Sequence, residues 1–205
     1  MQSRRRTEFC LPRTLLATFS YVRQISMLLM MLPIAIGLGT EIMVGHLVGA
    51  GDVDVAYRQL LRSLRLSFIV AFLASAVVAL FAPQLLGLFT ESPAVIASGA
   101  LLVRLSMVLE PGRTFNLVVI NALRATGDAR FPVLMGACSM WGLAVPLAWY
   151  FGVHLGWGLP GVWAAFITDE WVRGIAMYLR WKSRVWEKHA HASRARTADP
   201  EGAVA

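Results

Sequence analysis

The sequence predicts an all-α, polytopic membrane protein, and three observations lead to this prediction. Of the 205 residues, 57% are hydrophobic and 15% are charged, and the mean hydropathy is +0.61. Soluble domains carry about 25% charged residues, so a soluble core could not hold this many apolar side chains. Residues 66–90 contain no charged side chain, and residues 131–168 contain none except His154. Because a helix needs about 20 apolar residues to cross the hydrocarbon layer, the first run is one span and the second is longer than one.

Five membrane-spanning helices are expected within a membrane domain at 18–186. In chain order they cover 21–48, 61–86, 94–122, 131–151 and 158–179. The first ends in a glycine cluster, the second lies mostly and the fourth wholly in the charge-free runs, and the third and fifth contain internal charges. A basic leader at 1–17 precedes the domain. The polar, small-residue-rich segment 187–205 follows it and is expected to be a disordered tail.

The connections between these helices alternate in charge. Lys and Arg occur in 49–65, in 123–130 and in the tail from Arg180, whereas 87–93 and 152–157 contain neither. The positive-inside rule therefore predicts a multi-pass protein of the inner (plasma) membrane with a cytoplasmic C-terminus. Aromatic anchors agree with this orientation: Trp149, Tyr150 and Trp157 at the outer turn, and Trp181 and Trp186 at the inner surface.

The basic leader conflicts with a five-helix topology. Five spans with a cytoplasmic C-terminus place the N-terminus outside, but this region carries Arg4, Arg5, Arg6, Arg13 and Arg23. Natural chains rarely translocate such a leader. We therefore expect further spans before the first one in the complete protein; a non-native start within 1–17 is the alternative.

The stretch "VGHLVGAGDVDVA" poses a choice between a phosphate-binding loop and a helix end. It follows a helical apolar run rather than a strand, and no Walker lysine comes after it. Gly45 and Gly49 form a small-xxx-small pair that lets two membrane helices approach closely. Gly51 is suited to a helix C-terminus, and Asp52 to the N-cap of the next helix. The pattern favours helix packing and a turn over nucleotide binding.

Charges inside the third span predict a cavity. Glu110 and Arg113 are three residues apart on one helical face, and Asn116 lies about one turn further on. Pro111 and Gly112 between them predict a bent or unwound segment, such as those that line transporter cavities. An ion pair that only fixes helix packing is the alternative interpretation.

Three further intramembrane charges are candidates. Glu41 lies towards the inner part of the first span and is assigned to the same cavity. Asp169 and Arg173, at i and i+4 in the fifth span, are expected to pair and hold the lobe together. A functional role and a structural role remain equally open for this pair.

Several other classes of function are not expected. There is no H-E-x-x-H or G-x-S-x-G motif, so no enzyme and no catalytic residue is predicted. Cys10 and Cys138 lack CxxC or Cys/His spacing, which argues against a disulfide framework or a metal site. The net charge of +7 is spread over loops and tail, so nucleic acid is not an expected partner. No cofactor is expected, and membrane lipid surrounds the helices.

Three ordered motifs resemble the multidrug and toxic-compound extrusion (MATE) transporters. "PIAIGLGTEIMVGHLVGAGDVDVAY" is similar to the end of the second helix in each lobe of that family. "NALRATGDARFPV" looks like its LR-x-x-GD-x-x-x-P loop, and "VPLAWY…GLPGVWAAF" like its VPL-x-Y…G-x-GVW-x-A turn. The resemblance covers about residues 18–186, with the motifs in family order.

The resemblance implies twelve helices in two six-helix lobes that exchange Na⁺ or H⁺ for organic cations or other amphipathic compounds by alternating access. This chain would match helices eight to twelve, most of the C-terminal lobe, and would need the N-terminal lobe or a partner lobe. Arg113 stands near the position of an acidic cation-binding residue in some members, which argues against Na⁺ at that place. Glu110 could supply the acid only if the helix were rotated or unwound. A lipid-linked saccharide flippase of related fold and an inactive remnant or accessory subunit are the alternatives.

Overall fold

The computed structural model describes the backbone of residues 2–198 and the side chains of residues 14–192. Every regular element within these residues is a helix, which confirms the predicted all-α class. Most of the predicted leader at 1–17 and the end of the predicted tail, 199–205, lie outside the fully described residues. The elements are α1 (Gln2–Ala50), α2 (Val53–Leu80), α3 (Ala82–Gly87), α4 (Pro93–Ala125), α5 (Arg130–Ser139), η1 (Met140–Ala144), α6 (Val145–Trp149), η2 (Tyr150–His154), α7 (Leu159–Lys182) and α8 (Trp186–Ala198).

Four of the helical segments are long and apolar enough to cross a membrane. Among the described residues these are Thr14–Ala50, Val53–Leu80, Pro93–Ala125 and Arg130–His154. The fifth predicted span is present as α7, a helix of 24 residues, but Asp169, Glu170 and Arg173 lie near its middle. By length and composition alone, four described segments therefore qualify as spans, and α7 does not because these charges interrupt its apolar residues.

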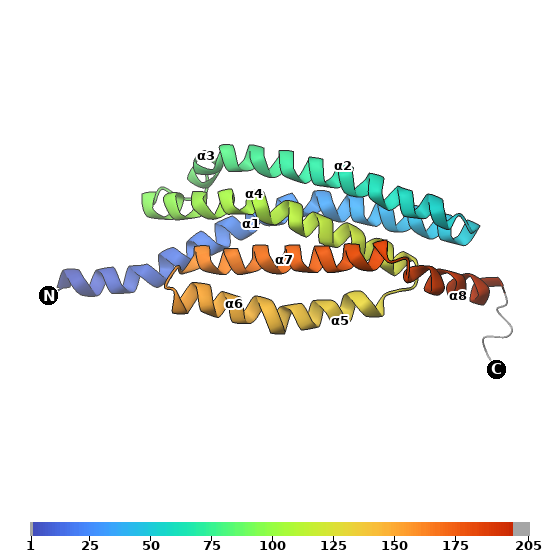
Figure 1. The fold of residues 1–205 in the computed structure, drawn as a ribbon. Helices are drawn as coiled ribbons and strands as arrows, with labels where there is room; N and C mark the ends of the chain where they lie inside the picture. The colour runs from blue at the N-terminus through green and yellow to red at the C-terminus, as the bar shows by residue number, and fades with distance from the viewer. Residues whose placement is uncertain (1, 199–205) are drawn as a thin grey trace.

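Successive long helices run in opposite directions along one bundle (Figure 1). Helix α4 is central and contacts α1, α2 and α7, while the segment α5–η2 packs against α7. The connections α1–α2 and α4–α5 lie at one end, with α8, and the connections α2–α4 and η2–α7 lie at the other. This arrangement places the basic connections together at one end, as the alternating charges predict.

The segment predicted as a single span at 131–151 is not a regular α-helix. Two π-helical turns, η1 and η2, interrupt it on either side of α6. Pro146 has no N–H to donate, and just before it the N–H of Val145 bonds to the carbonyl of Met140, five residues back. The helix accommodates the proline by widening one turn. The charge-free run on which the span was predicted gave no indication of this.

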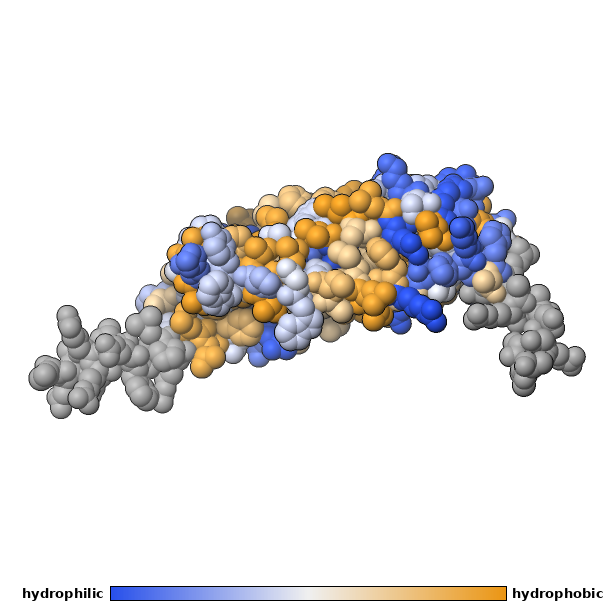
Figure 2. Space-filling view, turned by 60° about the horizontal axis from the view of Figure 1, so that its bottom comes forward, coloured by the Kyte–Doolittle hydropathy of each residue, from blue (hydrophilic) through white to orange (hydrophobic). Residues whose placement is uncertain are grey.

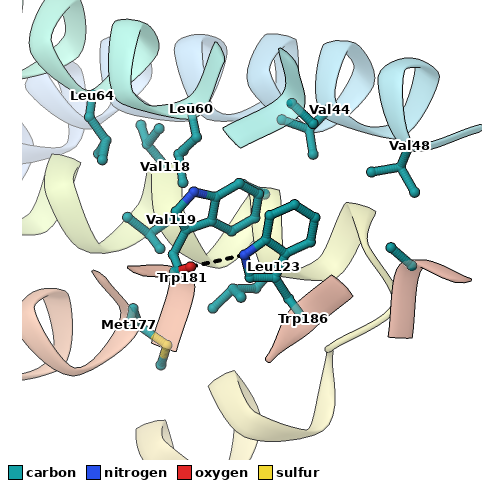
Figure 3. Close-up of a cluster of buried hydrophobic side chains, with 13 residues drawn as sticks. Val44, Val48, Leu60, Leu64, Val118, Val119, Leu123, Met177, Trp181 and Trp186 are labelled. Atoms are coloured by element: carbon teal, nitrogen blue, oxygen red, sulfur yellow. Dashed lines mark hydrogen bonds between the residues drawn. The ribbon is translucent and has the colours of Figure 1, made fainter. Parts of the chain in front are cut away.

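Trp181 and Trp186 lie in the core near the start of α8 (Figure 3). Both are fully buried, their rings stack with centroids 4.1 Å apart, and the indole N–H of Trp186 donates to the carbonyl of Trp181 at 2.9 Å. The prediction that they are interfacial anchors is wrong, because both rings fill the space between α1, α2, α4 and α7. The disorder predicted from residue 187 also needs correction, since Trp186 and the buried Ala190 attach α8 to this core.

A second core lies towards the opposite end of the bundle. Val22 of α1, Leu86 of α3 and Leu102 of α4 are buried there together with Trp163 of α7. The indole N–H of Trp163 donates to the hydroxyl of Ser106 at 3.1 Å, so the ring brings no unpaired donor into the apolar interior.

The outer surface of the bundle is apolar. Figure 2 shows hydrophobic residues over the middle of one face and hydrophilic residues gathered at one end. Large side chains such as Leu28, Val133 and Trp141 are more than two-thirds exposed: 74%, 71% and 71%. An exposed apolar belt of this extent is suited to lipid and not to water.

Candidate functional site

Helices α4 and α7 approach closely because two glycines lie between them. A Cβ on Gly112 would lie 2.7 Å from Nε1 of Trp171, and a Cβ on Gly174 would lie 2.8 Å from Cδ1 of Phe115. The indole N–H of Trp171 donates to the carbonyl of Val108 at 3.0 Å. Helix α4 continues unbroken through Pro111, so the predicted unwinding there does not occur. The packing of α7 against this turn supports the helix where the proline weakens it.

A network of charged side chains begins on α4 at this contact. Glu110 is 2% exposed, and its Oε1 lies 3.0 Å from Nη1 of Arg113. Nε of Arg113 lies 3.6 Å from Oε1 of Glu170 on α7. Asn116 donates from Nδ2 to Oε2 of Glu170 at 2.9 Å. The structure thus brings together Glu110, Arg113 and Asn116, the three third-span residues predicted to share a cavity.

The network continues along α7 to α5. Nη2 of Arg173 lies 2.7 Å from Oδ2 of Asp169, the predicted i, i+4 pair, and 3.3 Å from Oε1 of Glu170. The hydroxyl of Ser139 on α5 donates to Oδ1 of Asp169. Glu170 therefore contacts both arginines and joins the two halves of the network. Glu170 was not among the predicted site residues, although an acid three residues before Arg173 in a membrane helix was a usable signal.

The network contains more acid than base. Among the described residues, the ion pairs of Glu110, Asp169 and Glu170 are with two arginines, Arg113 and Arg173. Among the described residues, Oε2 of Glu110 and Oδ1 of Asn116 are buried without a hydrogen-bond partner. A buried excess negative charge is costly unless a proton or a cation neutralises it. Among the described residues, no three His, Cys, Asp or Glu side chains are placed to share a metal ion.

Two cavities adjoin this network. One has a volume of about 280 Å³ and is lined by Arg113, Met140, Ala144, Phe166, Asp169, Glu170 and Arg173. The other has a volume of about 260 Å³ and is lined by Phe19, Arg23, Ser26, Met27, Met30, Leu109, Arg113, Trp163 and Phe166. Arg113 and Phe166 line both, so they form the boundary between a charged compartment and an aromatic one.

Glu41 lies apart from this site. It lines an open groove near the start of α2, together with Gly45, Gly49 and Ala125. Ala125 is about 22 Å further along α4 than Glu110, at about 1.5 Å per residue. The assignment of Glu41 to the same cavity is therefore wrong, because one helix face extends over several turns and a single span can line two separate hollows.

The small-xxx-small pair does not pack against another helix in the described part of the chain. A Cβ on Gly45 or Gly49 would meet nothing within 4 Å among the described residues. Close approach of α1 to α4 occurs instead at Gly37, where a Cβ would collide with the amide of Asn121. The close contacts predicted for the glycine pair are absent here, and the pair faces the open groove.

The turn after α1 has the predicted backbone geometry. Gly51 has φ +92°, and the N–H of Asp52 donates to the carbonyl of Leu47 at 2.9 Å, which closes a Schellman motif. Asp52 occupies the N-cap position of α2, but its side chain makes no capping hydrogen bond. Its carbonyl accepts the first helical bonds, from Val55 and Ala56.

A matching turn follows α4 and is tied to the end of α7. Gly127 has φ +87°, and the buried Asp128 lies 2.8 Å from Nε of Arg180. Arg184, just after α7, similarly contacts Asp54 at 2.8 Å, and this hydrogen bond raises the pKa of Arg184. The turn after α4 is therefore linked to the last turn of α7, and the first turn of α2 is linked to the segment between α7 and α8. Sequence spacing alone did not indicate these contacts.

Comparisons with known proteins agree with this architecture. A family model described as MatE matches residues 10–150. The chain is 48% identical over 171 residues to the uncharacterized transporter YisQ of Bacillus subtilis, covering 83% of this chain and 38% of that protein. It is 31% identical over 183 residues to the probable multidrug resistance protein NorM of Bradyrhizobium diazoefficiens, covering 82% and 37%. For NorM of Xanthomonas axonopodis the values are 27% over 158 residues, 77% and 34%.

The chain thus spans 34–38% of the length of these relatives. The family model matches well over half of the chain, over the same helices that carry the glycine and loop motifs. The apolar helices and this match together describe a multi-pass membrane protein. The chain belongs to the MatE family, the multidrug and toxic-compound extrusion transporters.

Proposed function

We propose that this chain forms part of a secondary active antiporter that exports cationic or other amphipathic organic compounds. The observation that carries the proposal is the buried acid-rich network between α4 and α7, which adjoins two cavities. Polar groups at this depth in a membrane protein are expensive and are typical of ion and substrate pathways. Family membership, and relatives named multidrug resistance proteins, support export as the function.

The coupling ion is H⁺ or Na⁺, and the geometry favours H⁺. Oε1 of Glu110 is already paired with Arg113 at 3.0 Å, so a sodium ion held by Glu110 would lie close to a guanidinium. A proton on Glu110 instead removes the excess negative charge and weakens its contact with Arg113. We infer that protonation of Glu110 frees Arg113 to change partner during the transport cycle.

The rest of the proposal concerns placement and partners. The basic connections and α8 share one end of the bundle, so the positive-inside rule assigns that end, with the C-terminus, to the cytoplasmic side of the inner membrane. Because the chain spans only 34–38% of its relatives, alternating access requires a second lobe as its partner. Cavities of about 260 and 280 Å³ are small for a lipid-linked saccharide, so the flippase alternative gains no support.

A chimera tests this proposal. The part of the Bacillus subtilis relative that precedes the aligned region is fused to residues 18–205 of this chain and expressed in an efflux-deficient host. Accumulation of cationic dyes is then followed with and without the proton gradient. We expect export that stops when the gradient is collapsed, and loss of export in Glu110→Gln. Glu91→Gln, an exposed carboxylate outside the cavities, is the matched control.

Two results would contradict the proposal. If the chimera inserts and remains folded but exports nothing that the intact relative exports, this chain does not work as a transporter lobe. That outcome would favour the remnant or accessory-subunit alternative. The same alternative would be favoured if the relative's own lobe were fully active only when this chain is co-expressed. If Glu110→Gln exports as well as Glu91→Gln, Glu110 has no part in coupling.

A further inference from the structure

The aromatic cavity beside the charge network contains positive charge only. Its apolar lining comes from Phe19, Met27 and Met30 on α1, Leu109 on α4, and Trp163 and Phe166 on α7. Its two charged lining residues are Arg23 and Arg113, and no carboxylate lines it. Two acids of the network, Asp169 and Glu170, line the neighbouring cavity on the other side of Arg113 and Phe166. A ligand in the aromatic cavity would therefore meet guanidinium groups before carboxylates.

Arg23 is available to such a ligand. It is exposed on α1, and none of the ion pairs formed by the described residues involves it. Arg113 is 18% exposed and contacts Glu110 and Glu170 through Nη1 and Nε. An unpaired arginine in an apolar helix is unfavourable unless an anion or water satisfies it. Of the two guanidinium groups that line the cavity, that of Arg113 is already paired with carboxylates, and that of Arg23 forms no ion pair with the described residues.

We propose that this cavity binds a small amphipathic anion, an aromatic body carrying one carboxylate or similar acidic group. The guanidinium forks of Arg23 and Arg113 match the planar, bidentate geometry of a carboxylate. The aromatic side chains of Phe19, Trp163 and Phe166 offer an apolar lining for an aromatic ring, and the flexible side chains of Met27 and Met30 can adapt to its outline. This inference rests on the proposed export function and adds to it an acidic class of substrate.

The size of the cavity decides which amphipathic anions fit. Its volume of about 260 Å³ lies near the lower end of ligand pockets, which hold about 300–1,000 Å³. One or two fused rings fit such a space, whereas the chains of a phospholipid or a polyprenyl carrier do not. We therefore assign the ligand to small aromatic acids and treat an anionic lipid headgroup as the competing source of the same chemistry.

A matched set of fluorescent probes tests the assignment. Dansylglycine, dansylamide and dansylcadaverine share one ring system and carry an anion, no charge and a cation, respectively. Each is titrated into the full 205-residue chain in phosphatidylcholine nanodiscs, with fluorescence enhancement as the readout. We expect dansylglycine to bind at least about tenfold more tightly than the other two. Equal affinities, or tighter binding of dansylcadaverine, would overturn the proposal.

Variants locate the site. Arg23→Gln should weaken dansylglycine binding about tenfold and leave dansylamide unchanged, because one of two charge-assisted pairs is lost. Arg104→Gln removes the same charge from an exposed position on α4 outside the cavity and should change neither probe. If Arg23→Gln fails to fold, Arg23→Lys keeps the charge and should lose part of the preference. Equal effects at Arg23 and Arg104 would show a general charge effect and overturn the proposal.

Two further arms separate the lipid source and the export function. If phosphatidylglycerol in the nanodiscs abolishes dansylglycine binding in proportion to its content, the lipid headgroup occupies the site and the small-acid assignment fails. If the chimera exports cationic dyes while the chain ignores dansylglycine, the proposed function stands and this inference falls. Arg23-dependent dansylglycine binding without any export gives the reverse result.

Discussion

Replacing Gly112 by alanine should destabilise the contact between α4 and α7. The new Cβ would lie 2.7 Å from Nε1 and 2.8 Å from Cδ1 of Trp171, well inside van der Waals contact. The hydrogen bond from Trp171 to the Val108 carbonyl holds the indole ring against α4, so the ring would have to move to accommodate the new Cβ. Overpacking costs about 1–3 kcal/mol and the strained hydrogen bond about 1 kcal/mol, while alanine returns about 1 kcal/mol of helix propensity. The net loss is about 2 kcal/mol.

Thermal unfolding in detergent measures this loss against a matched control. At about 2–4 °C per kcal/mol for a chain of this size, Gly112→Ala should lower the Tm by about 4–8 °C. Gly136→Ala, also within a helix, has nothing within 4 Å of its added Cβ and should raise the Tm by about 2–4 °C. The double variant with Trp171→Phe should lose less than the sum of its parts. Shifts of the same sign for Gly112 and Gly136 would refute the assigned packing.

Three other substitutions test the network and the end of the bundle that carries α8. Glu170→Ala removes the carboxylate that contacts both Arg113 and Arg173 and should cost about 3 kcal/mol in thermal unfolding; a loss below about 1 kcal/mol would show that Glu170 does not join the network. Trp186→Ala should cost about 3–5 kcal/mol and release α8 to proteolysis, and a protected α8 would contradict its attachment to the core. Asp128→Asn breaks the buried pair with Arg180 and should cost about 2 kcal/mol, whereas Asp54→Asn, at an exposed pair, should change stability by less than about 1 kcal/mol; equal losses would contradict this ranking.

The helices and turns were predictable because their signals are local. Charge-free runs as long as a bilayer is thick predict spans, and Gly51 before an aspartate predicts a helix end. The identity of the helices that touch is not local. Trp186 shows the limit: a tryptophan near a helix end fits a membrane interface and a buried core equally well in sequence. Only the position of α7 beside α1, α2 and α4 decides between them.

The charged site was half predictable for the same reason. Glu110, Arg113 and Asn116 share a helix face, and so do Asp169 and Arg173, so spacing finds each group. Glu170 joins the groups only across the α4–α7 contact, which no spacing encodes. The prediction for Glu41 was wrong for a different reason. Its charge and its place in a membrane helix were compatible with the cavity, but its position along the bundle places it in another groove.

The glycines explain why that contact is hard to read from sequence. A small-xxx-small pattern places two glycines on one helix face, as at Gly45 and Gly49, but none of the described residues packs there. The contact that matters uses one glycine from each partner, Gly112 and Gly174, and places a large ring opposite each. Such a pair leaves no periodic signal in either helix. Close approach is nevertheless needed here, because it brings the carboxylate of Glu170 on α7 within reach of Arg113 on α4. The cavities lie beside this contact.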